Sequence, residues 1–585
     1  MNLGWIDWSI IAVYMVFSLG IGLYFTKRGT SNVVEYFAAG RSLTWWLAGT
    51  SIVATSFAAD TPLAIARIVR TQGFQGNWYW WCGVMGFMLC MFFFAPLWQR
   101  SRILTDVEFI ELRYGGRPAA ILRCFQALYL AFLANGITMG WVNLGMQKIV
   151  VETFGWPKEL TIPVLVAISL VYTALSGLWG VVVTDFFQFA LAMFGSIALM
   201  LFVLADVGGP AGLAEKVQTA LAGIASSPEA PLSKVADASQ VFNFLPDFSS
   251  GEAVILTFSF FILIQWWGGG QGGGFLAQRL FATKNEWHAV MALLWFTFAH
   301  FVVRTWPWIV VGLGSIIYFP QLADPELAYP KMMLKFLPAG MLGIMVAALL
   351  AAYMSTITTH LNWGASYLMN DIYRRFIRKD AAESHYIRIS QAFVVVMAVL
   401  SGVMAWQMDS IYRGWLILSE IGSGAAILGV LRWYWWRINA WSEISALASS
   451  LVMSNYFLFS GTLSGDHLYP LRFCIIMAAC TVVWLVVTFA TQPAPQEHLT
   501  AFYRRVRPGG FWGPVARACP DVQGFRVDAV KIVSWALGVA TIYLSLIGVG
   551  HLFLGRYGHG LLLLAASVVT GALLLRNVNR IDWAR

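Results

Sequence analysis

The chain has 585 residues, of which 59% are hydrophobic and only 11% are charged, and its formal net charge is +9. Soluble globular domains carry roughly 25% charged residues, so this composition excludes an ordinary soluble protein and indicates a polytopic membrane protein. The six cysteines are scattered without metal-ligand spacing, and we expect no disulfide framework.

About fifteen apolar stretches approach the ~20 residues that span a bilayer. In chain order they cover residues 6–26, 43–66, 78–98, 119–150, 160–177, 181–205, 252–282, 287–318, 337–371, 386–408, 411–437, 441–461, 470–491, 529–550 and 558–577. The first stretch has no basic residue before it and no clear cleavage site after it, so it is expected to be a retained span and not a signal peptide.

Basic residues gather in alternate loops between these stretches. They follow the first, third, ninth and thirteenth stretches, as Lys27, Arg28, Arg41, Arg100, Arg102, Arg113, Arg117, Arg123, Arg374, Arg375, Arg378, Lys379, Arg388, Arg504, Arg505 and Arg507. Because cytoplasmic loops are rich in Lys and Arg, the pattern predicts a cell-membrane protein with its N-terminus outside and its C-terminus in the cytoplasm. The expected partners include the lipid bilayer and no nucleic acid.

The second and seventh stretches are interrupted by helix-breaking sequence. The first interruption lies in the segment Ser51–Pro62, and the second is the glycine-rich run Gly268–Gly274. In hydrocarbon an unpaired backbone group costs several kcal/mol, so an unwound segment survives only where it lines a cavity or binds an ion. Two such breaks at matching places in two blocks of helices are typical of the binding site of a secondary transporter.

The positions of the breaks predict the organisation of the chain. If the first stretch is a leading helix, the next five form one block and the following five a second, and each block opens with a broken helix. An odd number of helices per block makes the two blocks inverted repeats in an all-α protein with about four trailing helices. The expected units are a leading helix and cytoplasmic loop (1–42), a first repeat (43–205), an external loop (206–250), a second repeat (251–440), two accessory helices (441–491), a cytoplasmic loop (492–528) and a final helix pair (529–585).

The ninth stretch carries a row of small polar residues. On a helix Ala352, Ser355, Thr356 and Thr359 share one face. Their oxygens suit a hard cation such as Na⁺, although Ser and Thr in membrane helices also bond to their own backbone or pack against a neighbouring helix. The broken segment favours the cation, because its freed carbonyls could supply the remaining ligands.

Several charged residues also fall in or near apolar stretches. Asp185, near the start of the sixth stretch, is either an interfacial helix cap or an ion ligand. Asp60, inside the first break, could pair with a nearby arginine or contact a polar solute. His300 and Arg304 lie one turn apart, and they serve a functional site or face a water-filled vestibule.

These residues resemble the sodium–solute symporter family, whose members carry sugars, proline, sialic acid, pantothenate, choline and inorganic anions. The resemblance covers roughly residues 5–440. Its motifs are Glu35–Arg41 before Trp45-Trp46, the Ser51–Asp60 break, Asp185–Gln188, Gln278-Arg279, and Ser355–Asn362 leading to Asp371–Tyr373. The family fold is a five-plus-five inverted repeat with one leading helix, which agrees with the organisation expected above.

The resemblance implies a cation site. Ala54, Phe57 and Ala352 would offer backbone carbonyls to one Na⁺, and Ser355 and Thr356 would offer hydroxyls. Some family members hold a second Na⁺, and the positions that match that site here are Asp185, Ser355, Thr358 and Thr359. All four are polar, which is consistent with a second ion.

The same resemblance places the solute near the two breaks. Sugar-binding members have a polar residue where this chain has Trp80 and an Asn near Gly273, so the chain departs from the sugar pocket of those members. Candidate solute contacts are Asp60, Thr61, Trp80, Gln271, Gly273 and Glu420.

The sequence therefore predicts a Na⁺-driven importer of a small organic solute that works by alternating access. The alternative is a membrane sensor that uses the same fold as a solute receptor. An integral-membrane enzyme is not expected, because the histidines are dispersed and no metalloprotease or nucleophile motif is present.

Overall fold

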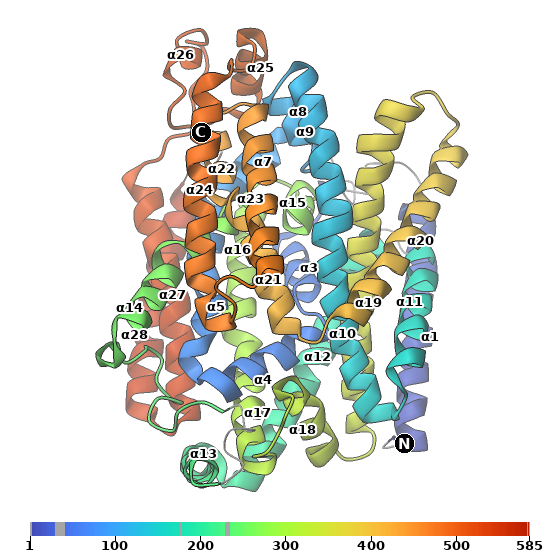
Figure 1. The fold of residues 1–585 in the computed structure, drawn as a ribbon, viewed down its shortest axis with the longest axis vertical. Coiled ribbons are helices and arrows are strands. Elements are labelled where there is room, and N and C mark those ends of the chain that lie inside the picture. The colour runs from blue at the N-terminus through green and yellow to red at the C-terminus, as the bar shows by residue number, and fades with distance from the viewer. Residues whose placement is uncertain are drawn as a thin grey trace.

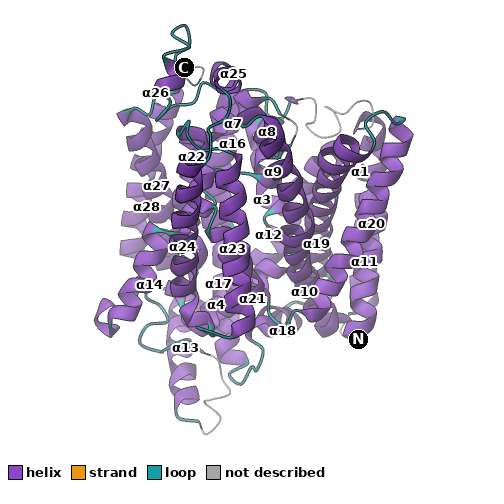
Figure 2. Cartoon of the chain, turned by 45° about the horizontal axis from the view of Figure 1, so that its top comes forward, coloured by secondary structure: helices purple, strands orange, loops and turns teal. Residues whose placement is uncertain are grey.

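The computed structural model describes residues 3–29, 41–103, 105–175, 178–227, 235–581 and 583. Residues 35–40 of the Glu35–Arg41 motif and residues 228–234 of the 206–250 loop lie outside this part. The described chain is an all-α bundle in which most helices run side by side, with loops and short helices at both ends (Figures 1 and 2). The two termini lie at opposite ends of the bundle (Figure 1).

A leading helix and a first block of helices make up the first part of the bundle. The leading helix is α1 (Trp5–Gly29). The block then contains α3 (Trp45–Thr55), α4 (Asp60–Gln72), η2 (Phe74–Asn77), α5 (Trp78–Trp81), α6 (Gly83–Leu89), η3 (Cys90–Phe94), α7 (Ala95–Ser101), α8 (Glu108–Arg113), α9 (Gly116–Leu128), η4 (Tyr129–Ala134), α10 (Asn135–Phe154), α11 (Lys158–Leu175) and α12 (Leu178–Val207). The helix α13 (Gly209–Ala225) and the turn η6 (Phe248–Ser250) lie in the following loop.

A second block and four trailing helices complete the fold. The block contains α14 (Glu252–Leu263), η7 (Gln265–Gly268), α15 (Gly274–Phe281), α16 (Glu286–Phe298), η8 (Ala299–Val303), α17 (Thr305–Tyr318), η9 (Pro325–Leu327), α18 (Ala328–Phe336), α19 (Met341–Ser366), η10 (Tyr367–Ile377), α20 (Glu383–Gln407), α21 (Ile411–Ser423) and α22 (Ala426–Tyr434). The trailing part contains α23 (Ala440–Ser460), η11 (Asp466–Leu468), α24 (Tyr469–Ala490), α25 (Gln496–Val506), α26 (Gly513–Ala516), α27 (Ala529–Phe553) and α28 (Tyr557–Arg580).

The number of long apolar helices is smaller than the number of apolar stretches in the sequence. In the described residues nine helices are long and apolar enough to cross a membrane, or eleven if each of two bent pairs counts as one span. The other predicted spans correspond to α1, α11, α23 and the α14–α15 segment. The last of these is split by its glycine run, and α23 carries serines and Glu443 along its length.

The two blocks are inverted repeats, as the sequence predicted. The first helix of each is discontinuous: α3 and α4 meet at an angle of 66°, and residues 269–273 separate η7 from α15. The second span of each block also carries a π-helical turn inside it, η3 in the first block and η8 in the second. Such turns are rare in α-helices, so their recurrence supports the equivalence of the two spans.

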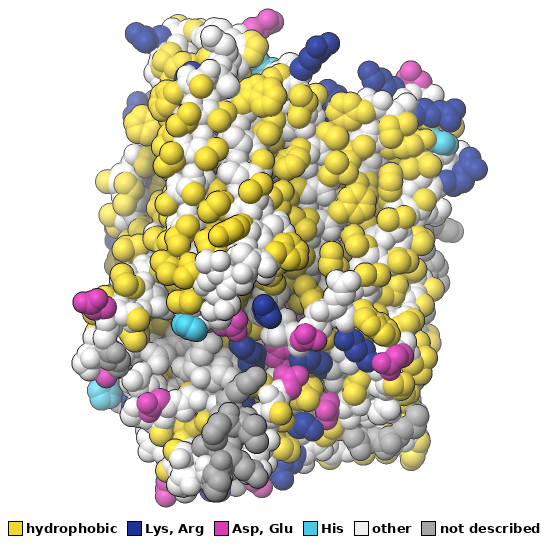
Figure 3. Space-filling model, viewed as in Figure 1, with side chains coloured by type: hydrophobic (Ala, Val, Ile, Leu, Met, Phe, Trp, Pro, Cys, Tyr) yellow, Lys and Arg dark blue, Asp and Glu magenta, His cyan; other side chains and the backbone are white. Residues whose placement is uncertain are grey.

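The surface of the bundle is arranged as a bilayer requires. A broad apolar band covers the middle of the visible face, and Lys, Arg, Asp and Glu gather toward the two ends (Figure 3). Exposed Val452, Val482, Leu562 and Val568 are among the apolar residues of the trailing helices α23, α24 and α28. Such apolar side chains are stable in contact with lipid tails. These helices therefore need no other part of the protein packed over them.

The leading and trailing helices are attached to particular parts of the two blocks. Asp7 of α1 accepts hydrogen bonds from the backbone of Gly340 and Gly343 at 2.7 and 2.8 Å, which caps the start of α19. On the trailing helix α27, Tyr543 donates to Trp81 O at 3.0 Å and Trp535 donates to Met85 O at 3.1 Å. The other trailing pair contacts α21: Ser450 of α23 donates to Ile421 O at 2.7 Å.

Candidate functional site

At the first discontinuity the backbone carbonyls at the end of α3 lack hydrogen-bond partners within a helix. Helix α3 stops at Thr55 and α4 starts at Asp60, two residues before Pro62, which is tolerated only in the first turn of a helix. The side chain of Arg304 fills the gap and donates to Ser56 O at 2.9 Å and to Val53 O at 3.4 Å. A cation at the C-terminus of a helix also interacts favourably with the helix dipole, so Arg304 stabilises the break.

The end of α3 lies directly against α19. Thr356 of α19 donates a hydrogen bond to the carbonyl of Thr55, the last residue of α3, at 3.2 Å. Ala54 and Phe57 flank this contact in the sequence, and both are buried, as is Ala352 one turn before Thr356. The oxygens that the family resemblance assigns to one Na⁺ therefore come from two segments that are in contact.

Asp185 joins the same two helices. Its carboxylate accepts a hydrogen bond from Ser51 of α3 and another from Ser355 of α19, both at 2.6 Å. The side chain is fully buried on α12, two turns from the start of that helix. Of the two alternatives for Asp185, the interfacial cap does not fit this position, because the carboxylate bridges two helices in the protein interior.

Arg279 completes this polar cluster. It lies on α15, directly after the second discontinuity, and donates to Ser51 Oγ at 3.4 Å and to Thr55 Oγ1 at 3.2 Å. Its side chain is fully buried. A buried cation beside a buried carboxylate reduces the cost of burying either charge, and here it connects the two discontinuous helices.

The remaining residues of the second predicted cation site lie on the next turn of α19. Thr358 accepts a hydrogen bond from Thr173 of α11 at 3.2 Å. Thr359 is buried, and its hydroxyl has no hydrogen-bond partner among the described residues. An unpaired buried hydroxyl is uncommon, and it is the kind of group that an ion or a water molecule can satisfy.

A cavity of about 590 Å³ lies beside this junction and is bounded by both discontinuities. Its size falls within the range of small-molecule sites. Aromatic side chains form much of its wall: Trp80, Phe87, Trp141, Phe275, Phe296, Trp363 and Trp415. Thr356 lines it as well, so the cavity and the α3–α19 contact share a residue.

Five of the six residues predicted to contact solute line this cavity. They are Asp60, Thr61, Trp80, Gln271 and Gly273. The sixth, Glu420, is not among the described lining residues, and its carboxylate pairs with Arg472 of α24 at 2.7 Å. Glu420 thus fastens an accessory helix to α21 in this structure.

Sequence reasoning did not select several polar residues of the cavity. Asn135 of α10 forms a hydrogen bond with the ring of His360 on α19 at 2.7 Å, and both residues line the cavity. Thr138 and Ser56 line it too. Asn135 and His360 are 225 positions apart, so only the packing of α10 against α19 brings them together.

A network of charges joins several elements at one end of the bundle, and we call it the Glu326 tie. Glu326, on η9, is 1% exposed and accepts hydrogen bonds from Lys148 of α10 and from Ser410 Oγ, both at 2.7 Å. It also accepts from the backbone of Ile411 and Tyr412 at the start of α21, at 3.1 and 3.2 Å. One carboxylate on η9 therefore binds both α10 and the start of α21.

A simpler contact, which we call the Asp106 tie, lies toward the opposite end of the bundle. Asp106, between α7 and α8, accepts a hydrogen bond from Gly274 N, the first residue of α15, at 2.8 Å. The hydroxyl of Tyr367, at the end of α19, donates to its other oxygen. The Asp106 tie thus joins the second discontinuous helix to the extension of α19.

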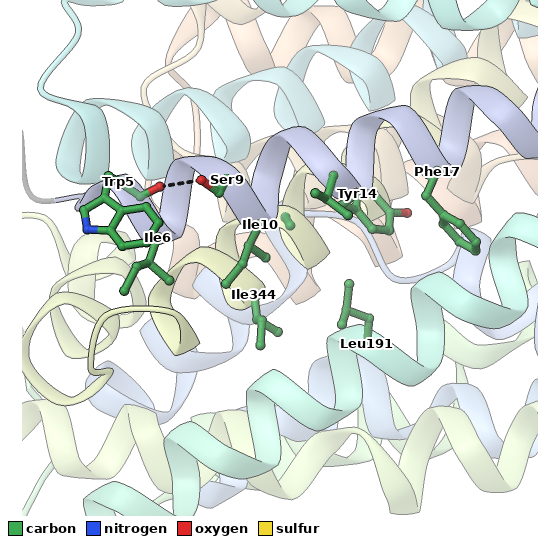
Figure 4. Close-up of a pocket in the computed structure, with 10 residues that line it drawn as sticks. Trp5, Ile6, Ser9, Ile10, Tyr14, Phe17, Leu191 and Ile344 are labelled. Carbon is green, nitrogen blue, oxygen red and sulfur yellow. Dashed lines mark hydrogen bonds between the residues drawn. The ribbon is translucent and has the colours of Figure 1, made fainter.

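An apolar groove of about 580 Å³ is separate from the cavity and lies between α1, α12 and α19. Trp5, Ile10 and Phe17 of α1 face Leu191 of α12 and Ile344 of α19 across it (Figure 4). The lining of the groove is almost entirely apolar, and the hydroxyl of Ser9 bonds to Trp5 O at 2.9 Å. We assign it no role in solute binding.

Comparison with known proteins decides the family. A profile of the sodium:solute symporter family matches residues 36–452. The chain belongs to the sodium:solute symporter family. It is therefore a sodium-coupled secondary transporter with many membrane spans, as the motifs predicted, and Na⁺ is its coupling ion.

Similar proteins cover most of the chain. It is 26% identical to the sodium/glucose cotransporter 4 of Danio rerio over 84% of this chain and 80% of the relative, and 26% identical to the human sodium/myo-inositol cotransporter 2 over 85% and 79%. It is 25% identical to the sodium/glucose cotransporter of Vibrio parahaemolyticus over 82% and 90%. These relatives are all cotransporters, which gives no support to the sensor alternative.

A solved structure confirms the fold. The substrate-bound, outward-open state of a Na⁺-coupled sialic acid symporter superposes with a TM-score of 0.64, covering 84% of this chain and 99% of that protein. The two sequences are 19% identical over this match.

Proposed function

We propose that this symporter binds Na⁺ where α3 meets α19 and a small organic solute in the adjacent cavity, and imports both without chemical change to the solute. The observation that carries the proposal is the hydrogen bond between Thr356 and the carbonyl of Thr55, because it places hydroxyl oxygens of α19 at the open end of α3. Hydroxyl and carbonyl oxygens are the ligands that hard cations prefer.

Na⁺ binding would couple to the solute through shared structure. An ion held by Ala54, Phe57, Ala352, Ser355 and Thr356 would order the break, and the break itself bounds the cavity. A second ion at Asp185, Ser355, Thr358 and Thr359 would use the unpaired hydroxyl of Thr359. Thr61, Gln271 and Gly273 would then contact the solute from the two discontinuous helices, and Trp80 would contact it from α5.

The driving force is sufficient for accumulation. Moving one charge through 100 mV supplies ~2.3 kcal/mol, and a tenfold Na⁺ gradient adds ~1.4 kcal/mol. Together these support accumulation on the order of several hundred-fold with one Na⁺ per solute. A second Na⁺ would roughly square that ratio.

We also propose that the protein lies in the cell membrane with its N-terminus outside and its C-terminus in the cytoplasm. The arginines of α25 and the basic residues after α19 lie at the same end as the C-terminus in the ribbon (Figure 1). The positive-inside rule then assigns this end to the cytoplasm. In this orientation the Glu326 tie closes the external side and the Asp106 tie lies toward the cytoplasmic side.

Binding of ²²Na⁺ to the purified protein, measured without solute, tests the cation site. Ser355→Ala removes a hydroxyl assigned to the ion, so we expect the Na⁺ affinity to fall about 3- to 10-fold. The matched control is Ser449→Ala on α23, whose hydroxyl bonds to Ser445 O of its own helix at 2.7 Å. Equal Na⁺ affinity in the two variants would contradict the assignment.

A further inference from the structure

The connection between α19 and α20, which includes η10, carries a dense group of positive charges. Its basic residues are Arg374, Arg375, Arg378, Lys379 and Arg388, and its acids are Asp380 and Glu383. Lys and Arg side chains gather over this connection at the upper right of the molecule (Figures 1 and 3). A basic cluster directly after a membrane helix is typical of a segment that contacts anionic lipid headgroups.

Two of these cations are paired within the protein. Arg375 forms an ion pair with Glu111 of α8. Arg374 lies 3.8 Å from Glu383, at the start of α20. The charge of these two arginines is therefore offset by neighbouring carboxylates.

The other three cations have no such partner, and we call them the free cations: Arg378, Lys379 and Arg388. Their side chains are exposed, and they form no hydrogen bond or ion pair within the described part of the chain. Positive charge that the protein itself does not offset is available to an anion from outside it. The free cations therefore define the charged part of a binding surface.

The turn that carries the free cations is held in place by Tyr386 of α20, which is buried. Its hydroxyl donates to the carbonyls of Arg378 and Lys379, at 2.9 and 2.7 Å, and accepts a hydrogen bond from Ala381 N at 3.1 Å. Arg388 follows Tyr386 by two positions on the same helix. Because the backbone is fixed by these bonds, the free cations occupy a defined place at the end of the bundle.

Large apolar side chains are exposed in the same connection. Phe376 is 48% exposed, Ile377 67% and Ile387 57%, and each lies within two positions of a free cation. At a membrane interface such side chains insert beside the acyl chains, while neighbouring Lys and Arg side chains extend toward the headgroups. This combination favours a lipid over a soluble anion, which would leave the apolar side chains uncovered.

We propose that the α19–α20 connection binds an anionic phospholipid, with the free cations at the headgroup phosphate and Phe376, Ile377 and Ile387 beside the acyl chains. The unpaired positive charge is complementary to a lipid of net negative charge, such as phosphatidylglycerol, and not to zwitterionic phosphatidylcholine. The assignment of this lipid to the cytoplasmic leaflet rests on the orientation proposed above, whereas the class of lipid does not.

A fluorescent label at Ser384→Cys tests the site in the full-length protein, in neutral detergent and in a background without the native cysteines. Ser384 is exposed at the start of α20, between the free cations in the sequence. Brominated acyl chains quench a fluorophore only at close range. We expect brominated phosphatidylglycerol to quench the label at a concentration about 10- to 100-fold lower than brominated phosphatidylcholine. Equal quenching by the two lipids would overturn the proposal.

Removal of the free cations tests their role directly. The triple substitution Arg378→Ala, Lys379→Ala and Arg388→Ala should raise the concentration of phosphatidylglycerol needed for half-quenching about 10- to 100-fold, because each cation near the headgroups contributes to binding. Quenching by phosphatidylcholine should stay the same. A triple variant that still prefers phosphatidylglycerol as strongly as the parent protein would contradict the assignment.

The matched control removes the same amount of positive charge from another loop. It combines Arg507→Ala, Arg517→Ala and Arg526→Ala, which replace three exposed arginines in the loop around α25 and α26. Charges farther from the lipid than the Debye length of about 10 Å are largely screened, so half-quenching should shift by less than about threefold. An equal loss in both triple variants would mean that net charge alone attracts the lipid, and the local site would be wrong.

The apolar residues distinguish a lipid from a soluble phosphate. Phe376→Ser combined with Ile377→Ser leaves the charge unchanged and should weaken quenching by phosphatidylglycerol at least about tenfold. Glycerophosphoglycerol, which is the headgroup without acyl chains, should not displace the brominated lipid where unlabelled phosphatidylglycerol does. If it displaced the lipid as well as phosphatidylglycerol does, the surface would belong to a soluble anion and the proposal would fail.

Failure of this inference can be told apart from failure of the proposed orientation. In sealed right-side-out vesicles, Ser384→Cys should be protected from a membrane-impermeant thiol reagent added outside. Labelling from outside would overturn the orientation and the assignment to the cytoplasmic leaflet. The difference in quenching between the two lipids is measured in detergent, so it decides the class of lipid in either case.

Discussion

The two ties at opposite ends of the bundle are built differently. The Glu326 tie combines a buried carboxylate with Lys148, a backbone cap on α21 and additional pairs from Arg67 and Asp324. The Asp106 tie uses one half-buried carboxylate and two neutral donors, a backbone N–H and a phenol. Hydrogen bonds within a buried ion pair are harder to replace than hydrogen bonds from neutral donors. The free energy needed to open the bundle should therefore differ between its two ends.

This contrast matters for a transporter that alternates between two openings. In the structure both ties are formed. The difference predicts that single substitutions at the Glu326 tie change the equilibrium between closed and open ends of the bundle more than single substitutions at the Asp106 tie. The following variants test that order, from the largest expected effect to the smallest.

The largest effect is expected for Glu326→Ala. The substitution removes the acceptor of four hydrogen bonds and leaves Lys148 with Asp324 as its nearest carboxylate, and loss of one partner of a buried pair costs about 3–5 kcal/mol. A Thr61→Cys reporter in the cavity, in a background without the native cysteines, should react at least about tenfold faster with a membrane-impermeant thiol reagent from outside. Unchanged labelling would show that Glu326 does not hold that end closed.

A smaller effect is expected for Asp106→Ala. Loss of the bonds to Gly274 and Tyr367 should destabilise the closed cytoplasmic end by roughly 1–3 kcal/mol. A Phe275→Cys reporter in the cavity should become more reactive in inside-out vesicles, while external labelling of the Thr61→Cys reporter stays the same. If external labelling rose instead, the assignment of the two ends would be reversed.

Arg67→Gln should have a weaker effect on the external end than Glu326→Ala. Arg67 lies 3.9 Å from Glu326 and 3.4 Å from Asp466, and its guanidinium stacks over Tyr412 at 4.2 Å. Partly exposed pairs contribute about 0–1 kcal/mol, so labelling of the Thr61→Cys reporter should rise by no more than about fivefold. A change as large as that of Glu326→Ala would show that Arg67 is an equal member of the tie.

The smallest effect is expected at the exposed pair between Arg504 of α25 and Asp521 in the following loop, where the two side chains approach to 2.5 Å. The hydrogen bond from Arg504 lowers the pKa of Asp521, so any stability from the pair is present at neutral pH and lost as pH falls through that pKa. Arg504→Ala should leave uptake and both labelling rates unchanged at pH 7. A measurable shift would mean that this loop takes part in opening the cytoplasmic end.

The sequence predicted the parts of this structure that depend on local pattern. Helix-breaking residues at 51–62 and 268–274 located both discontinuities, because a break in an apolar helix depends on the residues of that helix itself. The spacing of Ser355 and Thr356 likewise identified the face of α19 that meets α3. Their role as Na⁺ ligands stays a prediction, as does the division of the chain into units.

Contacts between distant segments were not visible in the sequence. Glu326 gave no signal there, because its partners on α10 and α21 lie 178 and 85 positions away in the chain. Glu420 was predicted to contact the solute, but it pairs with Arg472, and this pairing depends on how α24 packs against α21. Side-chain partners across helices follow from packing geometry, which a pattern of apolar residues constrains only to a face.

The hydrogen bonds that attach the trailing helices determine what spectroscopic labels on these helices could report. Helix α27 bonds to the second span of the first block through Trp81 and Met85, whereas α23 bonds to the last span of the second block through Ile421. Each accessory pair also bonds to the other repeat: Leu546 O of α27 accepts from Trp306 of α17 at 3.1 Å, and Glu443 of α23 accepts from Tyr114, just after α8, at 2.6 Å. Spectroscopic labels on the exposed faces of α24 and α28 would therefore report whether these cross-links hold during a transport cycle, without any alteration of the residues that handle cargo.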